Sequence, residues 1–532
     1  MNVNRRSFLW TLAAAGAYGQ TQPVACRIVD AKSNKMLPAR VRIVDARGQE
    51  QAPLGHAAAI ADDGHEGDVR FQSRRYSYVD GQFGIDPAWL PVRYQVIKGY
   101  EYTMAEGEIR SPGAFRIPLT RWSSISSRGW YSGDTHIHHI SPKTCRLEMD
   151  AEDLNVANIL TSDFTADQGE FEGQVNANSG AGSLIYVSQE FRHNDLGHMS
   201  LLNLKKLIEP VKTMQHVHYP LHMDVCDRAH AQGGYVTWAH FPSMPGIESP
   251  LDVALEKLDG LEILCVLEPR VLPVFAQQMV PEVTADNGLH MWYRYLNCGF
   301  RLTATAGTDK MTNFVTVGAN RVYAHVDGEF TYENWIEALR RGRTFVSNSP
   351  LLEFSVNGQE AGSTLALSSG RDKVLLIHAR SESQLPYDRL EIVRNGEVIA
   401  QASPSGERHT AEIHLEHPLE RSCWIAVRAL EDLKRYSTTD FHQIHSKEGT
   451  LLSSLYGTRR PEYVFAHSSA VYVIRDERPI RNSDDAQYYI GYMDNAIRWL
   501  NKSARFARES DKKASIEAFE RGKAVYVERA RK

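Results

Sequence analysis

The sequence predicts a multidomain protein that combines an α/β barrel with all-β regions and a helical tail. A chain of 532 residues is too long for one hydrophobic core. Residues 128–345 alternate between strand and helix patterns, whereas the segments on either side carry short β-branched runs broken by Gly, Pro, Asn and Asp. Residues 483–532 show apolar positions at helical spacing. We therefore expect a barrel between two β regions, followed by helices.

The N-terminal segment has the composition of an export signal. Arg5-Arg6-Ser7-Phe8-Leu9 precedes a short apolar run at 10–18, which is too short to span a bilayer. This pattern predicts a twin-arginine signal peptide over residues 1–20, with the twin-arginine export machinery as a partner and a periplasmic or extracellular location. The alternative is a chance arginine pair before an N-terminal helix. No later segment has about 18 uninterrupted apolar residues, so no stable membrane anchor is expected.

Two β-rich regions flank the barrel. Residues 23–120 contain strand candidates at 41–44 and 92–97, and their pattern resembles a β-sandwich of the carboxypeptidase-regulatory type with a scaffolding role. Residues 350–475 contain hairpin signals at Asn357-Gly358 and Asn395-Gly396, which predict a second β-sandwich. In the tail, Ser483-Asp484 is placed to cap one helix, and 512–529 predicts another.

The barrel region shows polar residues directly after its predicted strands. Strands are expected at 155–161, 235–239, 261–267 and 301–306, with helices at 220–232 and 281–297. Asp163, His240 and Asp309 each follow one of these strands. Because parallel strands with outer helices build active sites at their carboxyl ends, these side chains are expected to meet.

Charge, cysteines and motifs exclude several functions. The formal net charge is −5 and no basic face or Lys/Arg tract appears, so no nucleic-acid partner is expected. The six cysteines show no C-x-x-C spacing, which argues against a zinc ribbon or a thioredoxin-like site. No G-x-S-x-G elbow, P-loop or dinucleotide-binding glycine motif is present. The oligomeric state stays open.

His136 and His138 form the first metal-binding signal. On an extended strand, side chains two residues apart point the same way, so both imidazoles can reach one ion. The surrounding stretch, Trp130-Tyr131-Ser132-Gly133-Asp134-Thr135-His136-Ile137-His138, resembles the opening motif of the PHP (polymerase and histidinol phosphatase) superfamily, in its CehA/McbA-type metallohydrolase subgroup. Gly342-Arg343-Thr344-Phe345, which leads into the trailing β region, extends this resemblance. It implies a distorted (β/α)7 barrel that binds two or three metal ions.

The resemblance also implies a ligand set when it is carried over position by position. His136, His138, Glu190 and Asp309 would hold one ion, and the shared Glu190 would hold a second with His198 and His240. Three positions depart from the superfamily pattern, and all three fall on the ligands of a third metal: Phe164, Met311 and Thr144. We therefore expect two divalent ions, of Zn, Mn or Fe.

Further roles are expected near the ligands. Asp163 could relay a proton or orient a ligand, and Asp134 is expected to orient a ligand without binding the metal. Lys310 could replace the charge of the lost third cation, although it could equally be a surface lysine that points into solvent. Candidate substrate contacts are Arg192, His193 and Arg270.

The expected function is that of an exported, metal-dependent hydrolase of small molecules. Two metal ions would activate water against a carbamate, ester, amide or phosphoester bond. With only one lysine to replace the lost cation, a phosphomonoester dianion is less favoured than a carbamate, ester or amide. The alternative is a non-catalytic exported binding protein with a degenerate barrel, which would bind a glycan or a cell-surface partner.

Overall fold

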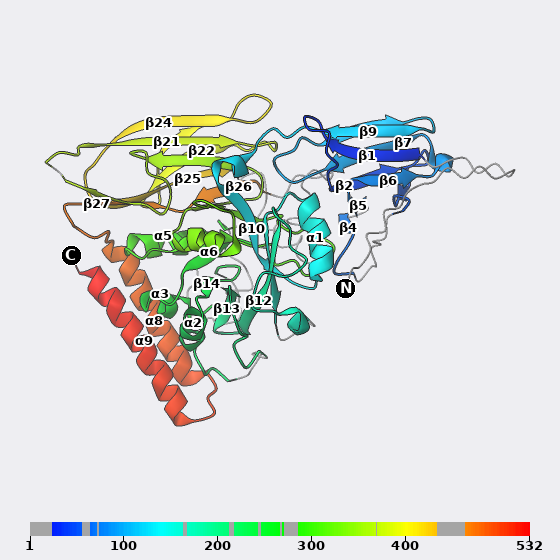
Figure 1. Ribbon diagram of the computed structural model, residues 1–532. Coiled ribbons are helices and arrows are strands. Elements are labelled where there is room, and N and C mark those ends of the chain that lie inside the picture. Colours follow the sequence, from blue (N-terminus) through cyan, green and yellow to red (C-terminus); the bar gives the residue numbers. More distant parts are fainter. Residues whose placement is uncertain are drawn as a thin grey trace.

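The computed structural model describes residues 24–55, 64–71, 74–162, 167–211, 217–242, 246–265, 269–270, 286–368, 370–432 and 463–531. These residues form a mixed α/β structure in which a curled sheet lies below two β-rich regions and a pair of long helices runs along one side (Figure 1). The predicted export segment lies outside the described residues. Among the described helices, none has the length and apolar character needed to cross a membrane.

The N-terminal β region consists of two sheets that share one hydrophobic core. The smaller sheet has the order β6-β1-β9, and the larger has the order β4-β5-β2-β7-β8 with β3 paired to β2. The strands are β1 (Val24–Asp30), β2 (Ala39–Val44), β3 (Glu50–Gln51), β4 (Val69–Phe71), β5 (Arg74–Val79), β6 (Gln82–Ile85), β7 (Val92–Ile97), β8 (Ala105–Ile109) and β9 (Ala114–Leu119). Alternating apolar residues of both sheets, such as Ile28 and Val41, are fully buried in this core.

The central sheet begins with seven strands that carry most of the site. In pairing order they are β16 (Thr303–Ala306), β15 (Gly260–Leu264), β14 (Tyr235–Trp238), β13 (Gly197–Leu202), β12 (Leu184–His193), β11 (Val156–Thr161) and β10 (Trp130–Ile137). Six of these strands run in the same direction, whereas β13 is antiparallel to both neighbours. The expectation of parallel strands is therefore wrong at β13. The reason is local: only residues 194–196 separate β12 from β13, which suffices for a hairpin but not for a crossover.

The sheet curls into a half-barrel, which brings its edge strand β16 back to β10. Ile137 and Lys310 form a parallel bridge, and the His138 N–H donates to the Lys310 carbonyl at 2.9 Å. Thr135 Oγ1 also lies 2.9 Å from the carbonyl oxygen of Ala306. Helices cover the half-barrel: α1 (Pro142–Ala151), α2 (His222–His230), α3 (Ser249–Ala254), α5 (Gly288–Asn297) and α6 (Tyr332–Arg340). The carboxyl ends of β10 and β16 thus share one edge.

The same sheet continues beyond β10 into the C-terminal β region without a break. Its further strands are β17 (Arg321–His325), β18 (Thr344–Ser347), β26 (Phe465–Ser468), β25 (Cys423–Leu430), β22 (Arg389–Arg394) and β23 (Glu397–Ala402), with β27 (Val471–Arg475) and β20 (Thr364–Leu367) off this path. A separate sheet contains β19 (Leu351–Val356), β21 (Val374–Glu382) and β24 (Ala411–Pro418). Asn395 and Gly396 form the tight turn between β22 and β23, with positive φ angles of 51° and 92°.

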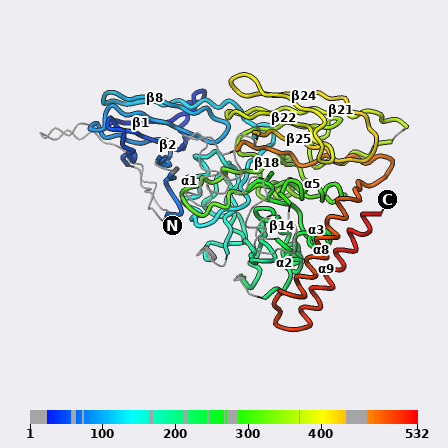
Figure 2. The backbone as a smooth tube through the Cα atoms, turned by 180° about the vertical axis from the view of Figure 1, so that it is seen from behind, coloured from blue at the N-terminus to red at the C-terminus, as the bar shows by residue number. Residues whose placement is uncertain are grey.

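The C-terminal helices α8 (Ser483–Lys502) and α9 (Glu509–Ala530) pack on each other and on the helical side of the half-barrel, opposite the N-terminal β region (Figure 2). Tyr489 of α8 stacks on Tyr295 of α5 at 4.3 Å and on Tyr526 of α9 at 5.0 Å between ring centroids. The predicted cap is displaced by one residue. The side chain of Asn482 accepts the N–H groups of residues 484 and 485, so Ser483 is already helical.

Candidate metal centre

The six predicted ligands meet at the edge where β10 and β16 converge. His136 lies in β10, Glu190 in β12 and His198 in β13, whereas the other three follow strands directly: His138 after β10, His240 after β14 and Asp309 after β16. Five of the six side chains are buried, and Asp309 retains 17% of its side-chain exposure. Along the strands, the ligand candidates alternate with core residues because successive side chains of a strand point to opposite faces of the sheet.

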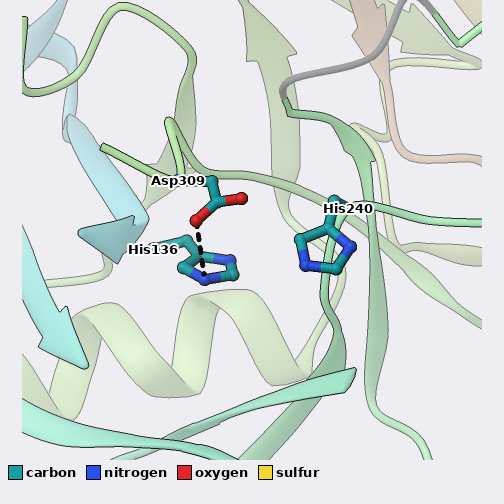
Figure 3. Close-up of side chains that lie close together, drawn as sticks. All are labelled: His136, His240 and Asp309. Atoms are coloured by element: carbon teal, nitrogen blue, oxygen red, sulfur yellow. Dashed lines mark ion pairs between the residues drawn. The ribbon is translucent and has the colours of Figure 1, made fainter. Parts of the chain in front are cut away.

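One group of donors surrounds His136 and His138. Their Nε2 atoms lie 3.0 Å apart, and His138 Nε2 lies 3.2 Å from Glu190 Oε2. Asp309 Oδ1 is 3.5 Å from His136 Nε2, and Figure 3 shows this carboxylate turned toward the imidazole. Ligand atoms on one tetrahedral Zn²⁺ ion are separated by about 3.3 Å, given Zn–N bonds of about 2.0–2.1 Å. The observed spacings match that of donors to a common ion.

A second group shares Glu190 with the first. Its other oxygen, Oε1, is 3.2 Å from His198 Nδ1 and 3.6 Å from His240 Nε2. The two imidazole nitrogens are themselves 3.2 Å apart. Glu190 Oε2 thus faces the first group, and Oε1 faces the second while also lying 3.6 Å from His136 Nε2. A carboxylate in this position can bridge two ions.

Hydrogen bonds hold His136 and His138 in the tautomer that a metal requires. His138 Nδ1 donates to the carbonyl of Leu160 at 2.8 Å, and His136 Nδ1 donates to Glu262 Oε2 at 3.0 Å. Because these oxygens can only accept, each Nδ1 carries the hydrogen and each Nε2 keeps a lone pair for the site.

Glu262 contacts the ligand candidates but is not among the residues that the sequence pointed to. It lies in β15, inside the stretch assigned simply as an apolar strand, and it is fully buried. Its carboxylate accepts hydrogen bonds from Thr135 Oγ1 at 2.8 Å, Ser200 Oγ at 3.0 Å and the backbone N–H of His240 at 2.9 Å. The sequence did contain a sign of this residue, because Glu262 is the one charged residue of the otherwise apolar strand β15.

The electrostatics of the site favour a cation. Burial alone would lower the pKa of His136, but the carboxylates of Glu262, Asp309 and Glu190 raise it well above its usual value. Among the described residues, Glu190 Oε1 and Asp309 Oδ1 are buried and have no hydrogen-bond donor. Four imidazoles with two carboxylates are a donor set that suits Zn²⁺, Mn²⁺ or Fe²⁺. The residues therefore fit the predicted metal ions.

Asp134 holds the backbone of the site. Its Oδ1 accepts the N–H groups of His136 at 3.0 Å and Thr308 at 2.9 Å, and its Oδ2 accepts from Thr308 Oγ1 at 2.6 Å and the Gly318 N–H at 2.8 Å. Burial raises the pKa of Asp134 to about 6, against the lowering effect of these hydrogen bonds. Asp134 thus joins the end of β10 to the loop that carries Asp309.

Two ligand candidates have backbones in the left-handed region. His240 has a φ of 35° and Asp309 a φ of 47°. Such conformations are unfavourable for residues other than glycine and persist where surrounding contacts impose them. At His240 one such contact is the N–H bond to Glu262. Both residues follow a strand, so the turn aims their side chains back over the strand ends.

Lys310 differs from both sequence-level interpretations. The alternative of a solvent-facing lysine is wrong, because the side chain is fully buried. Its ammonium donates to the carbonyls of Thr312 at 3.1 Å and Val315 at 3.0 Å and lies 3.8 Å from Glu148 Oε2. Its observed contacts are with this loop and α1. Among the described residues, the contacts of the ammonium do not include the side chains of the ligand candidates, so they give no support to the expected charge replacement.

The remaining four candidates have separate outcomes. Arg192 pairs with a ligand, since its Nη1 lies 2.9 Å from Glu190 Oε2. His193 Nδ1 accepts the N–H groups of residues 195 and 196 in its own turn, and its Nε2 donates to the carbonyl of Val217 in another loop. Arg270 donates to the carbonyl of Glu431 at 2.7 Å and so contacts the C-terminal β region. Asp163 lies outside the described residues.

Comparisons with known proteins do not assign the chain to a family. No family model matches it, and no curated protein matches it. The crystal structure of PsfC from Pseudomonas syringae PB-5123 aligns with 39% of this chain and 88% of the PsfC chain, at 15% identity and a TM-score of 0.28. A similarity of that size carries no argument about function, so the chemistry of the site has to be judged from its own geometry.

Proposed function

We propose that this protein is a metal-dependent hydrolase with a dinuclear centre. The observation that carries the proposal is Glu190, which is buried between two groups of imidazole nitrogens with one oxygen facing each. His136 and His138 would complete one ion site with Asp309, and His198 and His240 the other. The fixed Nδ1–H tautomers of His136 and His138 support the assignment, because they leave the lone pairs directed into the site.

The proposal includes the fold family. The half-barrel with its outer helices would be a distorted (β/α)7 barrel of the PHP superfamily, of the CehA/McbA type, flanked by two β-sandwich domains. Support comes from the ligand candidates, which lie in or after strands β10, β12, β13, β14 and β16 of the half-barrel in the chain order that the resemblance implies. The residues at the expected third-metal positions are not ligands here, which favours two ions over three.

Bound divalent ions would supply a water nucleophile at neutral pH and polarise the oxygen of the scissile bond. The chain's own residues hold the donors in place: Glu262 orients His136, and Asp134 ties the ends of β10 and β16 together. Asp163 remains our candidate for the proton relay to the leaving group. Arg192, beside Glu190, can also meet an anionic part of the substrate.

Among the candidate bonds, we favour a carbamate, ester or amide, with a phosphodiester as the next choice. The Lys310 ammonium is buried and bonded to two carbonyls, so it is not placed to compensate a phosphomonoester dianion. The twin-arginine pattern adds the proposal that the enzyme acts in the periplasm or outside the cell.

The test is the metal content of the mature chain, purified without chelator and measured by mass spectrometry. We expect about two equivalents in the wild type, loss of metal in His136→Ala, and no change in the control His414→Ala, whose imidazole is exposed on β24. Removal of the metal should abolish the hydrolysis of carbamate or ester substrates. Absence of metal after attempted reloading would contradict the proposal and favour the non-catalytic binding protein.

A further inference from the structure

A pocket of about 500 Å³ lies between the half-barrel and the C-terminal β region. On the half-barrel side it is lined by residues that directly precede β15, β16 and β18, such as Asp259, Leu302 and Arg343. On the other side lie the turn before β20 and the turn between β26 and β27. Because the ligand candidates gather at the carboxyl ends of β10 and β16, this pocket is at the opposite, amino ends of the strands. The metal centre does not use it.

Close packing of the two sides gives the pocket a defined shape. The Ala304 N–H in β16 donates to Ser469 Oγ at 2.9 Å, across the boundary between the two regions. Gly362 has a φ of 85°, and a Cβ atom at this position would collide with the carbonyl oxygen of Arg341. Only glycine allows these two loops to approach so closely. The walls of the pocket are therefore fixed by the packing of the fold.

Arginine side chains dominate the lining of this pocket. One precedes β16, and three come from the end of α6 and the turn that leads to β18: Arg301, Arg340, Arg341 and Arg343. Among the described lining residues, Asp259 is the one carboxylate, and its Oδ2 already accepts from His230 Nε2 at 2.9 Å and from the Val236 N–H at 2.7 Å. The lining side chains therefore carry four positive charges against one negative charge.

Two of these arginines are neutralised by carboxylates that lie outside the pocket. Arg341 Nε is 2.8 Å from Glu337 Oε1, and Arg343 Nε is 2.5 Å from Glu360 Oε1. Asp327 pairs with both arginines. These three carboxylates are not among the lining residues. Arg341 and Arg343 therefore add little net charge to the pocket.

The other two arginines, Arg301 and Arg340, are exposed and have no carboxylate oxygen within 4.0 Å in the described part of the chain. The guanidinium carbon of Arg301 lies 4.9 Å from the ring centroid of Tyr472, a contact that orients the guanidinium without a hydrogen bond. Arg340 uses its Nη2, which donates to the Gly234 carbonyl at 3.0 Å. Because a guanidinium carries five N–H groups, both arginines have donors available for a ligand.

We infer that this pocket binds a small organic phosphate, as a ligand and not as the substrate, with its phosphate group between Arg301 and Arg340. Two guanidiniums without carboxylate partners match the charge of a phosphomonoester, which is about −2, and their planar forks fit its oxygens. A volume of about 500 Å³ lies in the range of small-molecule sites and leaves room for an organic group beside Leu258 and Leu302. The inference is independent of the proposed function, because the described lining residues include none of the ligand candidates.

The experiment is calorimetry of glycerol 3-phosphate binding to the full chain at about pH 8 and low salt, where the phosphate is a dianion and exposed charges are little screened. We expect the affinity to fall about 10- to 100-fold in Arg301→Ala and in Arg340→Ala, as for loss of a charged hydrogen-bond donor. Arg301→Lys keeps the charge without the planar fork and should bind with intermediate affinity. Arg110→Ala, which removes an exposed arginine of the N-terminal β region, is the matched control. Because Arg301 and Arg340 are exposed, their variants should keep the wild-type Tm without ligand.

Two comparisons separate this pocket from the metal centre and from a general attraction of anions. His136→Ala, which is expected to lose the metal, should still bind glycerol 3-phosphate, and adding Arg301→Ala or Arg340→Ala to it should remove that binding. Glycerate, a monocarboxylate of similar size, should bind at least about 10-fold more weakly, because it carries one negative charge fewer. Absence of glycerol 3-phosphate binding in His136→Ala, unchanged binding after either arginine is replaced in that variant, or equal binding of glycerate would overturn the inference.

Discussion

His136 and His138 show how single hydrogen bonds prepare a metal ligand. Each imidazole has one nitrogen directed into the site and the other bonded to an oxygen, of Glu262 in one case and of Leu160 in the other. Glu262 has a wider role, because it also accepts from Thr135, Ser200 and the His240 backbone, and so connects four strands or strand ends. We expect such an outer partner to affect metal affinity as strongly as some direct ligands do.

Glu262→Gln should weaken metal binding about 10- to 100-fold without unfolding the chain. The glutamine keeps the shape, but its NH₂ group would face the N–H groups of His136 and His240, which are also donors. Competition with a chromophoric chelator measures the change. Glu412→Gln, which removes an exposed carboxylate of β24, is the control, and equal affinities in all three proteins would contradict the prediction.

At the scale of elements, the site depends on how closely β16 approaches β10. Gly307 follows β16, and a Cβ atom at this position would lie 2.4 Å from His136 Cβ and 2.9 Å from its backbone nitrogen. No L side chain fits there unless one strand moves. The glycine therefore lets the curled sheet bring its two ends together at the ligand edge.

Gly307→Ala should lower the free energy of unfolding by about 1–3 kcal/mol, as for overpacking, and should reduce metal content because His136 is displaced. Denaturant unfolding and mass spectrometry report the two effects. Gly491→Ala provides the contrast: it lies in α8 with no atom within 4 Å of the added Cβ, so it should stabilise the protein by about 0.5–1 kcal/mol. A Gly307→Ala protein with native stability and full metal content would contradict this account.

At the scale of the whole molecule, one sheet joins the half-barrel to the C-terminal β region. β18 pairs with β26, and the indole of Trp424 in β25 donates to Asn297 of α5 at 2.7 Å. The helices α8 and α9 cover the helical side of the half-barrel, and Phe519 is fully buried there. Removal of either part would expose core surface, so these regions are expected to unfold together.

A buried carboxyl pair should make this global stability depend on pH. Burial raises the pKa of Glu248 to about 8, and burial beside Glu248 raises that of Asp252 well above its usual value. A raised carboxyl pKa means that the folded state binds more protons than the unfolded state. The contribution of Glu248 to the free energy of unfolding is therefore complete below about pH 4.5 and is lost as the pH rises through about 8. The neighbouring His222 makes stability depend on pH in the opposite direction. Burial lowers the pKa of its imidazole, so its contribution to the free energy of unfolding is lost as the pH falls below about 6.5.

Asp252→Asn removes one of the two titrating carboxyl groups. The fall in the free energy of unfolding between pH 5 and pH 8 should therefore be smaller in this variant than in wild type, by on the order of 1–3 kcal/mol. Urea unfolding at a series of pH values measures the difference, and comparison at each pH cancels the effect of His222. Parallel curves for the two proteins would contradict the prediction.

The sequence by itself named the candidate ligands. The spacing of His136 and His138 on a strand indicated the first pair, the strand pattern placed His240 and Asp309 after strands, and the resemblance to the PHP superfamily implied the full set. The hairpin at Asn395-Gly396 and the two tail helices were predictable from local patterns.

Only the tertiary structure decided how these segments meet. The reversed direction of β13, the burial of Lys310, the bond between Glu262 and His136, and the approach of His65 to Met311 all join parts of the chain that local patterns cannot relate. A strand pattern sets which way a side chain points, but not which strand lies beside it. Those neighbours depend on the packing of the whole sheet, which is why the candidate ligands could be named from the sequence and the residues that contact them could not.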